Sequence, residues 1–322
     1  MKEGERKILV TGAFGQIGSE LVPALQKKHG EENVVALGHN NIPSDFQGIV
    51  EKGDPRDKSA IDKIIKTHNV GTIYHLVSLL SARGEENPAF TRDVNMNGLT
   101  NILDLAVQYQ ARVFWPSSIA AFGPTTPRDN TPQKTILEPT TMYGVTKVSG
   151  ENECRYYFIK YGLDVRSVRY PGLISWKAEP GGGTTDYAVA IFYEGLRKGE
   201  YTCFVKPDTT LPMMYMDDAI RGTLDLMDAK LDLTKRREER NWDSYNFAAI
   251  SFKAEELAEE LRKHIPGLKI GYSPDHRQKI ADSWPKSIDD SLAREEWGWK
   301  HQFDLSAMTN TMVEHLKKKF KK

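Results

Sequence analysis

Tyr143 and Lys147 stand four residues apart in the segment YGVTK, a spacing that places both side chains on one face of a helix. A lysine ammonium beside a phenol favours the phenolate, so this pair could lower the tyrosine pKa from its ordinary value of about 10 toward neutrality. The phenolate could then take a proton from an alcohol. Because such pairs also occur in helices that only pack, a chemical role needs a cofactor site and a further hydroxyl nearby.

A glycine-rich segment near the start of the chain predicts the cofactor site. TGAFGQIG, residues 11–18, spaces Gly12, Gly15 and Gly18 as G-x-x-G-x-x-G between an expected strand and an expected helix. Glycines there let the backbone turn tightly and approach a pyrophosphate, which the helix N-terminus then binds. Three glycines alone are a weak signal, but their place between strand and helix predicts a dinucleotide site.

The position that normally selects the dinucleotide is unusual. NAD-binding chains carry an acid at the end of the second strand, whereas this strand ends at Gly38. His39, Asn40 and Asn41 could hydrogen-bond the ribose, and no arginine is expected there for a 2′-phosphate, so NAD is predicted rather than NADP. Asp54 could reach the adenine, or it could equally cap a turn or a helix.

Two serines are expected beside the same site. PSSIAAFG, residues 116–123, closes a strand and brings Ser117 and Ser118 to the carboxyl edge of the sheet, where ligands of doubly wound sheets bind. The helix that opens with Tyr143 should begin at this edge too. A serine, the tyrosine and the lysine would then converge beside a nicotinamide that takes the hydride from the alcohol.

Apolar runs and helical periodicity alternate over the first 172 residues. Strands are expected at 7–12, 33–38, 70–78, 111–118 and 163–172, and helices at 59–67, at 94–110 and from Tyr143 onward. This alternation implies right-handed crossovers and a parallel sheet covered by helices on both faces. We therefore predict an α/β fold, a doubly wound Rossmann sheet over residues 1–174 that also takes back parts of 210–250.

The remaining residues, 175–322, predict a smaller substrate-binding lobe interleaved with the first. Its expected elements are an amphipathic helix at 186–197, an extended piece and a helix at 211–227, a strand at 244–249 and a helix at 252–265. The chain from Tyr272 onward is expected to be irregular and aromatic, and the closing KKKFKK to be a solvated helix end.

Composition excludes several classes of function. The 322 residues carry 44 Lys+Arg and 44 Asp+Glu, so no net field favours nucleic acid or an acidic membrane surface. The two cysteines, Cys154 and Cys203, give no disulfide framework and no zinc pair, which indicates a reducing compartment such as the cytoplasm. The early first strand predicts no signal or transit peptide, although a trimmed mitochondrial transit peptide stays possible.

Taken together, the glycine loop, PSSIAAFG and YGVTK resemble the extended short-chain dehydrogenase/reductase superfamily. Further strings narrow the resemblance to L-threonine 3-dehydrogenases of the short-chain type: LLSARGE, YPGLIS, PGGGTTDYAV, LPMMYMDD, ADSWP and DDSLAREEWGW. The likeness extends from about Lys7 to Leu305. The departure is Gly38, where relatives carry an aspartate, and this puts the discrimination between NAD and NADP in question.

The resemblance implies a reaction and roles for the residues. The family oxidises the 3-hydroxyl of L-threonine to 2-amino-3-oxobutanoate with NAD, in threonine catabolism. By resemblance, Tyr143 is the general base, Lys147 holds the nicotinamide ribose, and Ser118, with Ser117 beside it, binds the reacting oxygen. The cofactor contacts that it implies, besides the glycine loop, His39, Asn40 and Asp54, are Gln16, Ile17, Leu76, Tyr143, Lys147, Tyr170 and Pro171.

The same resemblance predicts the substrate pocket and the assembly. Ser81 matches a substrate contact, and the loop residues Gly182, Gly183, Thr184 and Thr185 precede a helix whose N-terminus would suit a carboxylate. Alternatively, these loop residues only begin the helix, with a threonine as its N-cap. Trp284 would cover the methyl side of the substrate, unless it is surface packing. Pairing of the helices 94–110 and 143–161 with a second copy predicts a homodimer.

Two other functions fit the same frame. A nucleotide-sugar epimerase or dehydratase would need an asparagine-containing motif after the late strand, where this chain has YPGLIS, and a larger pocket. A redox sensor that binds NAD without chemistry would not need Ser118, Tyr143 and Lys147. No H-E-x-x-H or C-x-x-C occurs, so a metal-independent enzyme is predicted.

Overall fold

The computed structural model describes residues 6–39 and 42–321. Its central feature is a seven-stranded sheet in the order β10-β6-β5-β4-β1-β2-β3, in which every neighbouring pair is parallel. The strands are β1 (Lys7–Thr11), β2 (Val34–Gly38), β3 (Ile49–Lys52), β4 (Val70–His75), β5 (Arg112–Ser118), β6 (Val165–Tyr170) and β10 (Tyr245–Asn246). The order 3-2-1-4-5-6 is that of a doubly wound Rossmann sheet, so the predicted fold class is confirmed.

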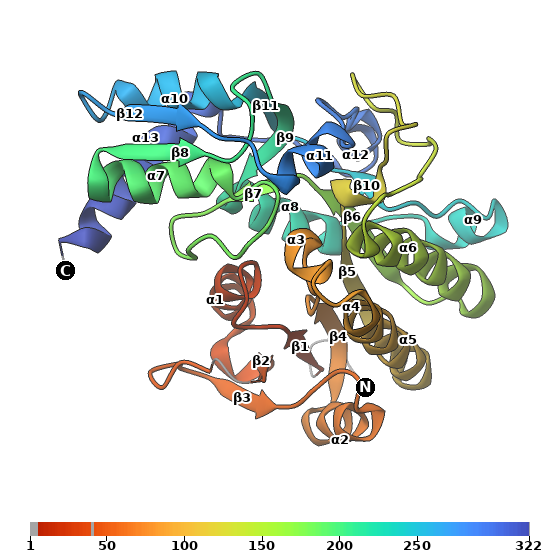
Figure 1. Ribbon diagram of the computed structural model, residues 1–322. Coiled ribbons are helices and arrows are strands. Elements are labelled where there is room, and N and C mark those ends of the chain that lie inside the picture. Colours follow the sequence, from red (N-terminus) through yellow and green to blue (C-terminus); the bar gives the residue numbers. More distant parts are fainter. Residues whose placement is uncertain (1–5, 40–41, 322) are drawn as a thin grey trace.

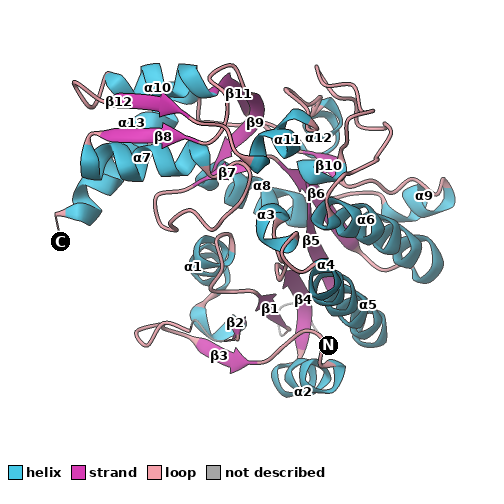
Figure 2. Cartoon of the chain, viewed as in Figure 1, coloured by secondary structure: helices cyan, strands magenta, loops and turns pink. Residues whose placement is uncertain are grey.

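Helices cover both faces of this sheet (Figures 1 and 2). Side chains alternate along β1, where Leu9 is buried toward one face and Ile8 and Val10 toward the other. The first face carries α2 (Lys58–His68), α5 (Gly98–Tyr109) and α6 (Met142–Tyr161), and the second carries α1 (Gly18–His29) and α8 (Met216–Asp228). Burial on both faces explains why the strands read as apolar runs in the sequence.

Short elements join the sheet to its helices. They are η2 (Glu31–Asn33), α3 (Ser81–Gly84), α4 (Pro88–Arg92), the π-helical turn η3 (Asp93–Asn97), η4 (Ile119–Ala121) and α9 (Leu233–Glu238). The predicted helix 94–110 therefore begins with a π turn and becomes regular only at Gly98. Such turns are frequent at functional sites because they redirect side chains locally.

The second half of the chain forms a smaller lobe with sheets of its own. One sheet has the order β11-β9-β7, with β7 (Gly172–Ile174), β9 (Thr210–Tyr215) and β11 (Ile250–Lys253). The other pairs β8 (Glu200–Cys203) with β12 (Lys269–Tyr272). The helices α7 (Tyr187–Lys198), α10 (Ala254–Arg262) and α13 (Leu305–Phe320) pack beside them (Figure 1). From this half, β10 and α8 lie on the central sheet, and the boundary at 174 stays a prediction.

The expectation of an irregular chain after Tyr272 is wrong. The structure places α11 (His276–Asp282), α12 (Ser291–Trp297) and α13 there. Side chains of Asp275 and Asp304 cap α11 and α13 by accepting hydrogen bonds from backbone amides in their first turns. The last helix buries Met308, Met312, Val313 and Leu316, so tertiary packing stabilises a segment whose sequence reads as polar. Within the described ranges, no helix is long and apolar enough to cross a membrane.

Candidate active site

Two neighbouring cavities open at the carboxyl edge of the central sheet, one on each side of the glycine turn. Gly12, Phe14 and Gly15 line the first, which has a volume of about 350 Å³, whereas Gln16 and Ile17 line the second, of about 120 Å³. A dinucleotide bound across the carboxyl edge of a Rossmann sheet needs such a pair of cavities, one for each nucleoside. The first lies beside β2 and β3, and the second beside β5, β6 and α6.

The glycine turn has the conformation that a pyrophosphate site requires. Gly12 has φ +69°, and a Cβ there would lie 3.1 Å from the backbone nitrogen of Val77. A Cβ on Gly18 would lie 2.3 Å from the carbonyl oxygen of Gly12, so this third glycine lets α1 begin directly against the turn. These residues fit a dinucleotide, because the turn brings the N-terminus of α1 beside the place for its phosphates.

Phe14 explains the missing acid at Gly38. A Cβ on Gly38 would lie 2.6 Å from a ring carbon of Phe14, which occupies the space that an aspartate needs. Phe14 in turn packs edge-on against Phe46, with 5.1 Å between ring centroids. His39 is exposed and lines the same cavity, whereas the predicted contacts Asn40 and Asn41 lie outside the described residues. The aromatic ring of Phe14 thus takes the place of a carboxylate at the end of β2.

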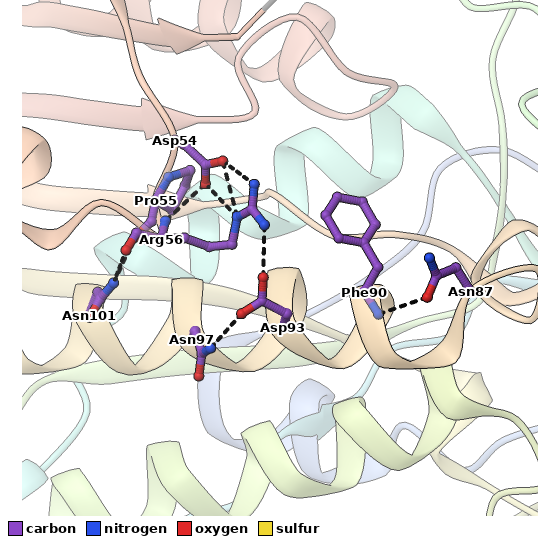
Figure 3. A network of polar contacts seen from close by, with 8 residues as sticks. All are labelled: Asp54, Pro55, Arg56, Asn87, Phe90, Asp93, Asn97 and Asn101. Atoms are coloured by element: carbon purple, nitrogen blue, oxygen red, sulfur yellow. Dashed lines mark hydrogen bonds and ion pairs between the residues drawn. The ribbon is translucent and has the colours of Figure 1, made fainter.

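The structure corrects the expectation that no arginine lies near the ribose. Arg56 follows β3 and lines the same cavity as Gly38, His39 and Asp54. Its guanidinium is bound by both carboxylate oxygens of Asp54, at 2.6–3.1 Å, and is therefore not free to bind a phosphate (Figure 3). Asp54 also accepts the backbone N–H of Arg56, as in the predicted turn.

Tyr143 and Lys147 lie in the first two turns of α6, which Thr141 caps by accepting a hydrogen bond from the Gly144 amide. Both line the smaller cavity, with the Lys147 Nζ 5.4 Å from the centre of the Tyr143 ring. The same Nζ donates a 2.6 Å hydrogen bond to the carbonyl of Pro116. The structure therefore brings the predicted phenol and ammonium together at the end of β5.

Burial changes the titration of this pair in opposite directions. It raises the pKa of Tyr143 to about 12, although a hydrogen bond with Ser118 acts against this rise. It lowers the pKa of Lys147 to about 7, and only part of that effect is offset by the charge of Glu151. In the protein alone, desolvation of the two groups is therefore the larger effect. The lowering of the tyrosine pKa beside a bound nicotinamide stays a prediction.

The two predicted serines face different surroundings. Ser118 Oγ accepts a 3.2 Å hydrogen bond from the Ala120 amide at the start of η4, which leaves its own proton available toward Tyr143. Ser117 is buried, and its hydroxyl donates a 2.5 Å hydrogen bond to the carboxylate of Glu151. The structure thus places Ser118 beside the phenol and ties Ser117 to the core.

The predicted substrate residues line the far side of the smaller cavity. Ser81, at the start of α3, and Thr184 are buried, and their hydroxyl oxygens lie 3.1 Å apart. Gly183, Thr185 and the buried Trp284 line the same space, so Trp284 is not surface packing. Leu76, Tyr170 and Pro171 complete the wall.

The glycine loop before α7 differs from its expected role. The amides of Gly181, Gly182 and Gly183 all donate to one carboxylate oxygen of Asp186, at 2.7–2.8 Å. These amides are therefore not available for a substrate carboxylate, and Gly182 is exposed outside the cavity lining. The hydroxyls of Ser81, Thr184 and Thr185 line the cavity and can donate to a substrate in place of these amides.

Sequence reasoning missed several residues of the site. Phe14, Arg56 and Phe90 line the larger cavity, and Ser78 and Asp186 line the smaller one. Two of them carried a usable signal: Phe14 lies inside the glycine pattern, and Asp186 directly follows its glycine-threonine loop. Arg56 and Phe90 carried none, because they are 34 residues apart in sequence and meet only in the fold.

No group of three His, Cys, Asp or Glu residues in the described chain has the arrangement of a metal site.

The parallel sheet order, the glycine turn and the Ser118, Tyr143 and Lys147 set define a short-chain dehydrogenase/reductase of the extended type.

Comparison with known proteins identifies the family. Residues 8–237 match the NAD dependent epimerase/dehydratase family, and the chain belongs to that family. NAD is accordingly its cofactor.

The relatives cover nearly the whole chain. It is 47% identical to an uncharacterized epimerase/dehydratase of Staphylococcus haemolyticus, over 97% of this chain and 98% of that one. It is 45% identical to the mitochondrial L-threonine 3-dehydrogenase of Bos taurus, over 96% of this chain and 82% of that one. A solved monomeric L-threonine 3-dehydrogenase from a metagenome superimposes with a TM-score of 0.92 at 49% identity, over 97% and 99% of the chains. The resemblance inferred from the sequence is thus confirmed.

Proposed function

We propose that this protein oxidises the 3-hydroxyl of L-threonine to 2-amino-3-oxobutanoate with NAD, as the first step of threonine breakdown. The observation that carries the proposal is the smaller cavity, in which Ser118, Tyr143 and Lys147 stand opposite Ser81, Thr184 and Trp284. Relatives named L-threonine 3-dehydrogenase support the choice of substrate, because their likeness covers nearly all of this chain.

Tyr143 is the general base of the proposed reaction. Its phenol and the Ser118 hydroxyl line the same cavity, and Ser118 lies close enough to act on the pKa of the phenol, so both can contact a single substrate oxygen. Ser118 binds that oxygen, and Tyr143 takes its proton. NAD, when bound, supplies the hydride acceptor and a positive ring that favours the phenolate.

Lys147 orients the nicotinamide ribose and supports the phenolate. Its Nζ is buried, close to both the Tyr143 ring and the Trp115 ring, and is held by the Pro116 carbonyl. That carbonyl belongs to the strand that carries Ser118, so one hydrogen bond aligns helix and strand. A phenolate at Tyr143 would in turn favour the charged form of Lys147, whose pKa is about 7 in the protein alone, because water is largely excluded from both groups and charge interactions there are strong.

The substrate carboxylate is held by hydroxyl groups. Ser81 and Thr184 approach each other across the cavity, and Thr185 lies beside them. Hydroxyls can turn their protons toward an anion, which the amides bound to Asp186 cannot do. Trp284 closes the apolar side, where it would contact the methyl group.

A spectrophotometric assay tests the proposal. The purified chain is mixed with NAD and L-threonine, and the absorbance of the reduced cofactor is followed. We expect reduction with L-threonine and none with L-alanine, which lacks the hydroxyl. Conversion of a UDP-sugar without threonine oxidation would indicate an epimerase, and NAD binding without either reaction would indicate a sensor.

Assembly and location belong to the proposal as well. A homodimer and a cytoplasmic site of action remain predictions from the sequence, and one structural relative is itself described as monomeric. Light scattering coupled to gel filtration measures the first directly.

A further inference from the structure

Arg56 is held by two carboxylates at the adenosine end of the cofactor site (Figure 3). Asp54 binds its Nε and one terminal nitrogen, and Asp93 binds the other terminal nitrogen at 2.7 Å. The Phe90 ring lies on the guanidinium, with 5.2 Å from Cζ to the ring centroid. Each nitrogen of the guanidinium therefore already has a carboxylate partner, although the side chain is 33% exposed.

The second carboxylate is fixed by the π turn. Asp93 begins η3, and the Asn97 side chain, four residues later, donates a 2.5 Å hydrogen bond to its other oxygen. Asn101 on α5 donates to the backbone carbonyls of Pro55 and Arg56, which holds the β3 loop against the same helix. The side chains of Asp93, Asn97 and Asn101, which lie on consecutive helical turns, therefore set the position of this arginine.

The group carries a net negative charge beside the place for the ribose. Its arginine is positive, and the hydrogen bonds from it hold the pKa of both carboxyls below the usual range. Asp54 and Arg56 line the same cavity as Gly12, Gly38 and His39. In a Rossmann fold the ribose hydroxyls lie at the end of β2, which here is Gly38.

We propose that the Asp54, Arg56 and Asp93 group excludes cofactors with a 2′-phosphate, a task that an acid at the end of β2 performs in other chains. A free arginine at this place would favour NADP. Two carboxylates cancel its charge and leave one negative charge in excess, and they also occupy the nitrogens that would bind a phosphate. The inference concerns the cofactor site of the proposed enzyme and does not depend on its substrate.

Binding of cofactor fragments to the full chain tests this inference without any reaction. The probes are ADP-ribose and 2′-phospho-ADP-ribose, and isothermal titration calorimetry gives both dissociation constants. The wild-type protein should bind ADP-ribose at least about tenfold more tightly. Asp93→Asn leaves one nitrogen of Arg56 with only a weaker, neutral acceptor and removes the excess charge, so this ratio should fall by about threefold or more while ADP-ribose affinity changes little.

Two further variants distinguish the effect of the Asp54, Arg56 and Asp93 group from the general effect of removing a charge. Asp104→Asn is the matched control. Asp104 also lies on α5 and forms an ion pair with Lys58 at 2.7 Å, and neither residue lines the cavity. It should leave the ratio unchanged. Arg56→Gln leaves two carboxylates unopposed and should increase the preference for ADP-ribose, an effect that about 1 M salt should reduce strongly.

The inference is overturned if the wild-type protein binds both fragments equally. It is also overturned if Asp93→Asn and Asp104→Asn lower the ratio to the same extent, or if Arg56→Gln leaves it unchanged. None of these binding results tests the proposed oxidation of threonine, which the absorbance assay measures separately. Failure of the proposed reaction would likewise leave the fragment titrations interpretable.

Discussion

The hydroxyl of Ser117 donates a 2.5 Å hydrogen bond to the carboxylate of Glu151, one helical turn after Lys147. Glu151 is buried and also binds Arg169 through two hydrogen bonds of 2.8–2.9 Å. This contact fixes β5 against α6, the two elements that carry Ser118 and Lys147. Ser117 therefore acts on the site through its neighbours, whereas Ser118 faces it directly.

Substitution of the two serines should separate these roles. Ser118→Ala should lower turnover with L-threonine by about tenfold to a hundredfold with little change in stability, because it removes a hydrogen bond to the reacting oxygen. Ser117→Ala should lower the free energy of unfolding by about 1–3 kcal/mol, since it deprives a buried carboxylate of a donor. Initial rates and urea unfolding measure the two effects, and equal losses of turnover in both variants would contradict the assignment.

Tyr143→Phe should abolish most of the proposed activity. The phenyl ring keeps the packing of α6 but cannot take a proton, so turnover should fall by at least about a hundredfold. Binding of NAD should stay nearly unchanged, as measured by calorimetry. Tyr157→Phe, farther along α6 and outside both cavities, is the control and should retain activity. A small effect at position 143 would place the base elsewhere.

Local sequence patterns were sufficient to predict most strands of the central sheet and the helical face that Tyr143 and Lys147 share, but β3 was not predicted. Buried runs such as VVALG on β2 and the glycine turn at Gly12 can be recognised within a short stretch of sequence, and they were found. The Tyr143 and Lys147 pair follows from helical spacing alone. Short strands such as β8 and β12 were not found, because each pairs with a strand that is distant in the sequence.

What the sequence could not predict depends on contacts between distant residues. Arg56 meets Asp93 across 37 positions, and Ser81 meets Thr184 across 103. The pKa of Tyr143 depends on how deeply α6 is buried, which no local pattern shows. The occupied amides before α7 were missed because spacing suggested an anion site but did not show that Asp186 fills it.

Burial of Lys147 predicts a specific dependence of stability on pH. Its pKa is about 7 in the folded protein and about 10.4 in an unfolded chain. Between these values the unfolded chain binds more protons, so folding becomes more favourable as pH rises through this window. Relative to Lys147→Met, the free energy of unfolding of the wild-type protein should rise by about 1.4 kcal/mol for each pH unit there.

Below about pH 7 and above about pH 10.4 the difference between the two proteins should not vary with pH. Chemical denaturation at several pH values measures it. A difference that stays constant between pH 7 and 10 would show that Lys147 remains charged in the folded protein.

Asp186→Asn should loosen the loop before α7. The charged oxygen that accepts three amides becomes a weaker, neutral acceptor, so the loop that carries Thr184 loses its fixed position. We expect KM for L-threonine to rise by about threefold to thirtyfold, with a smaller change in affinity for NAD. Glu179→Gln is the control, because Glu179 is an exposed residue nearby that pairs with Arg197. Equal KM values in the two variants would refute this role.

Gly38→Asp, which introduces the acid that NAD-binding chains normally have at the end of β2, should fail to improve NAD binding. A Cβ at this position would lie 2.6 and 2.7 Å from two ring carbons of Phe14 and 2.8 Å from Ile42. Because Phe14 is also packed against Phe46, its ring cannot move without loss of that contact. The added side chain should therefore cost about 1–3 kcal/mol of stability and weaken ADP-ribose binding.

Two companion variants separate crowding from charge. Gly38→Ala introduces the same close contact without a carboxylate, so it should lose a similar amount of stability. The double variant Gly38→Asp with Phe14→Ala removes the obstructing ring and should bind ADP-ribose more tightly than Gly38→Asp alone. Calorimetry and thermal unfolding of the three proteins measure these effects. Tighter binding by Gly38→Asp alone, at unchanged stability, would mean that the Phe14 ring moves easily and does not exclude the acid.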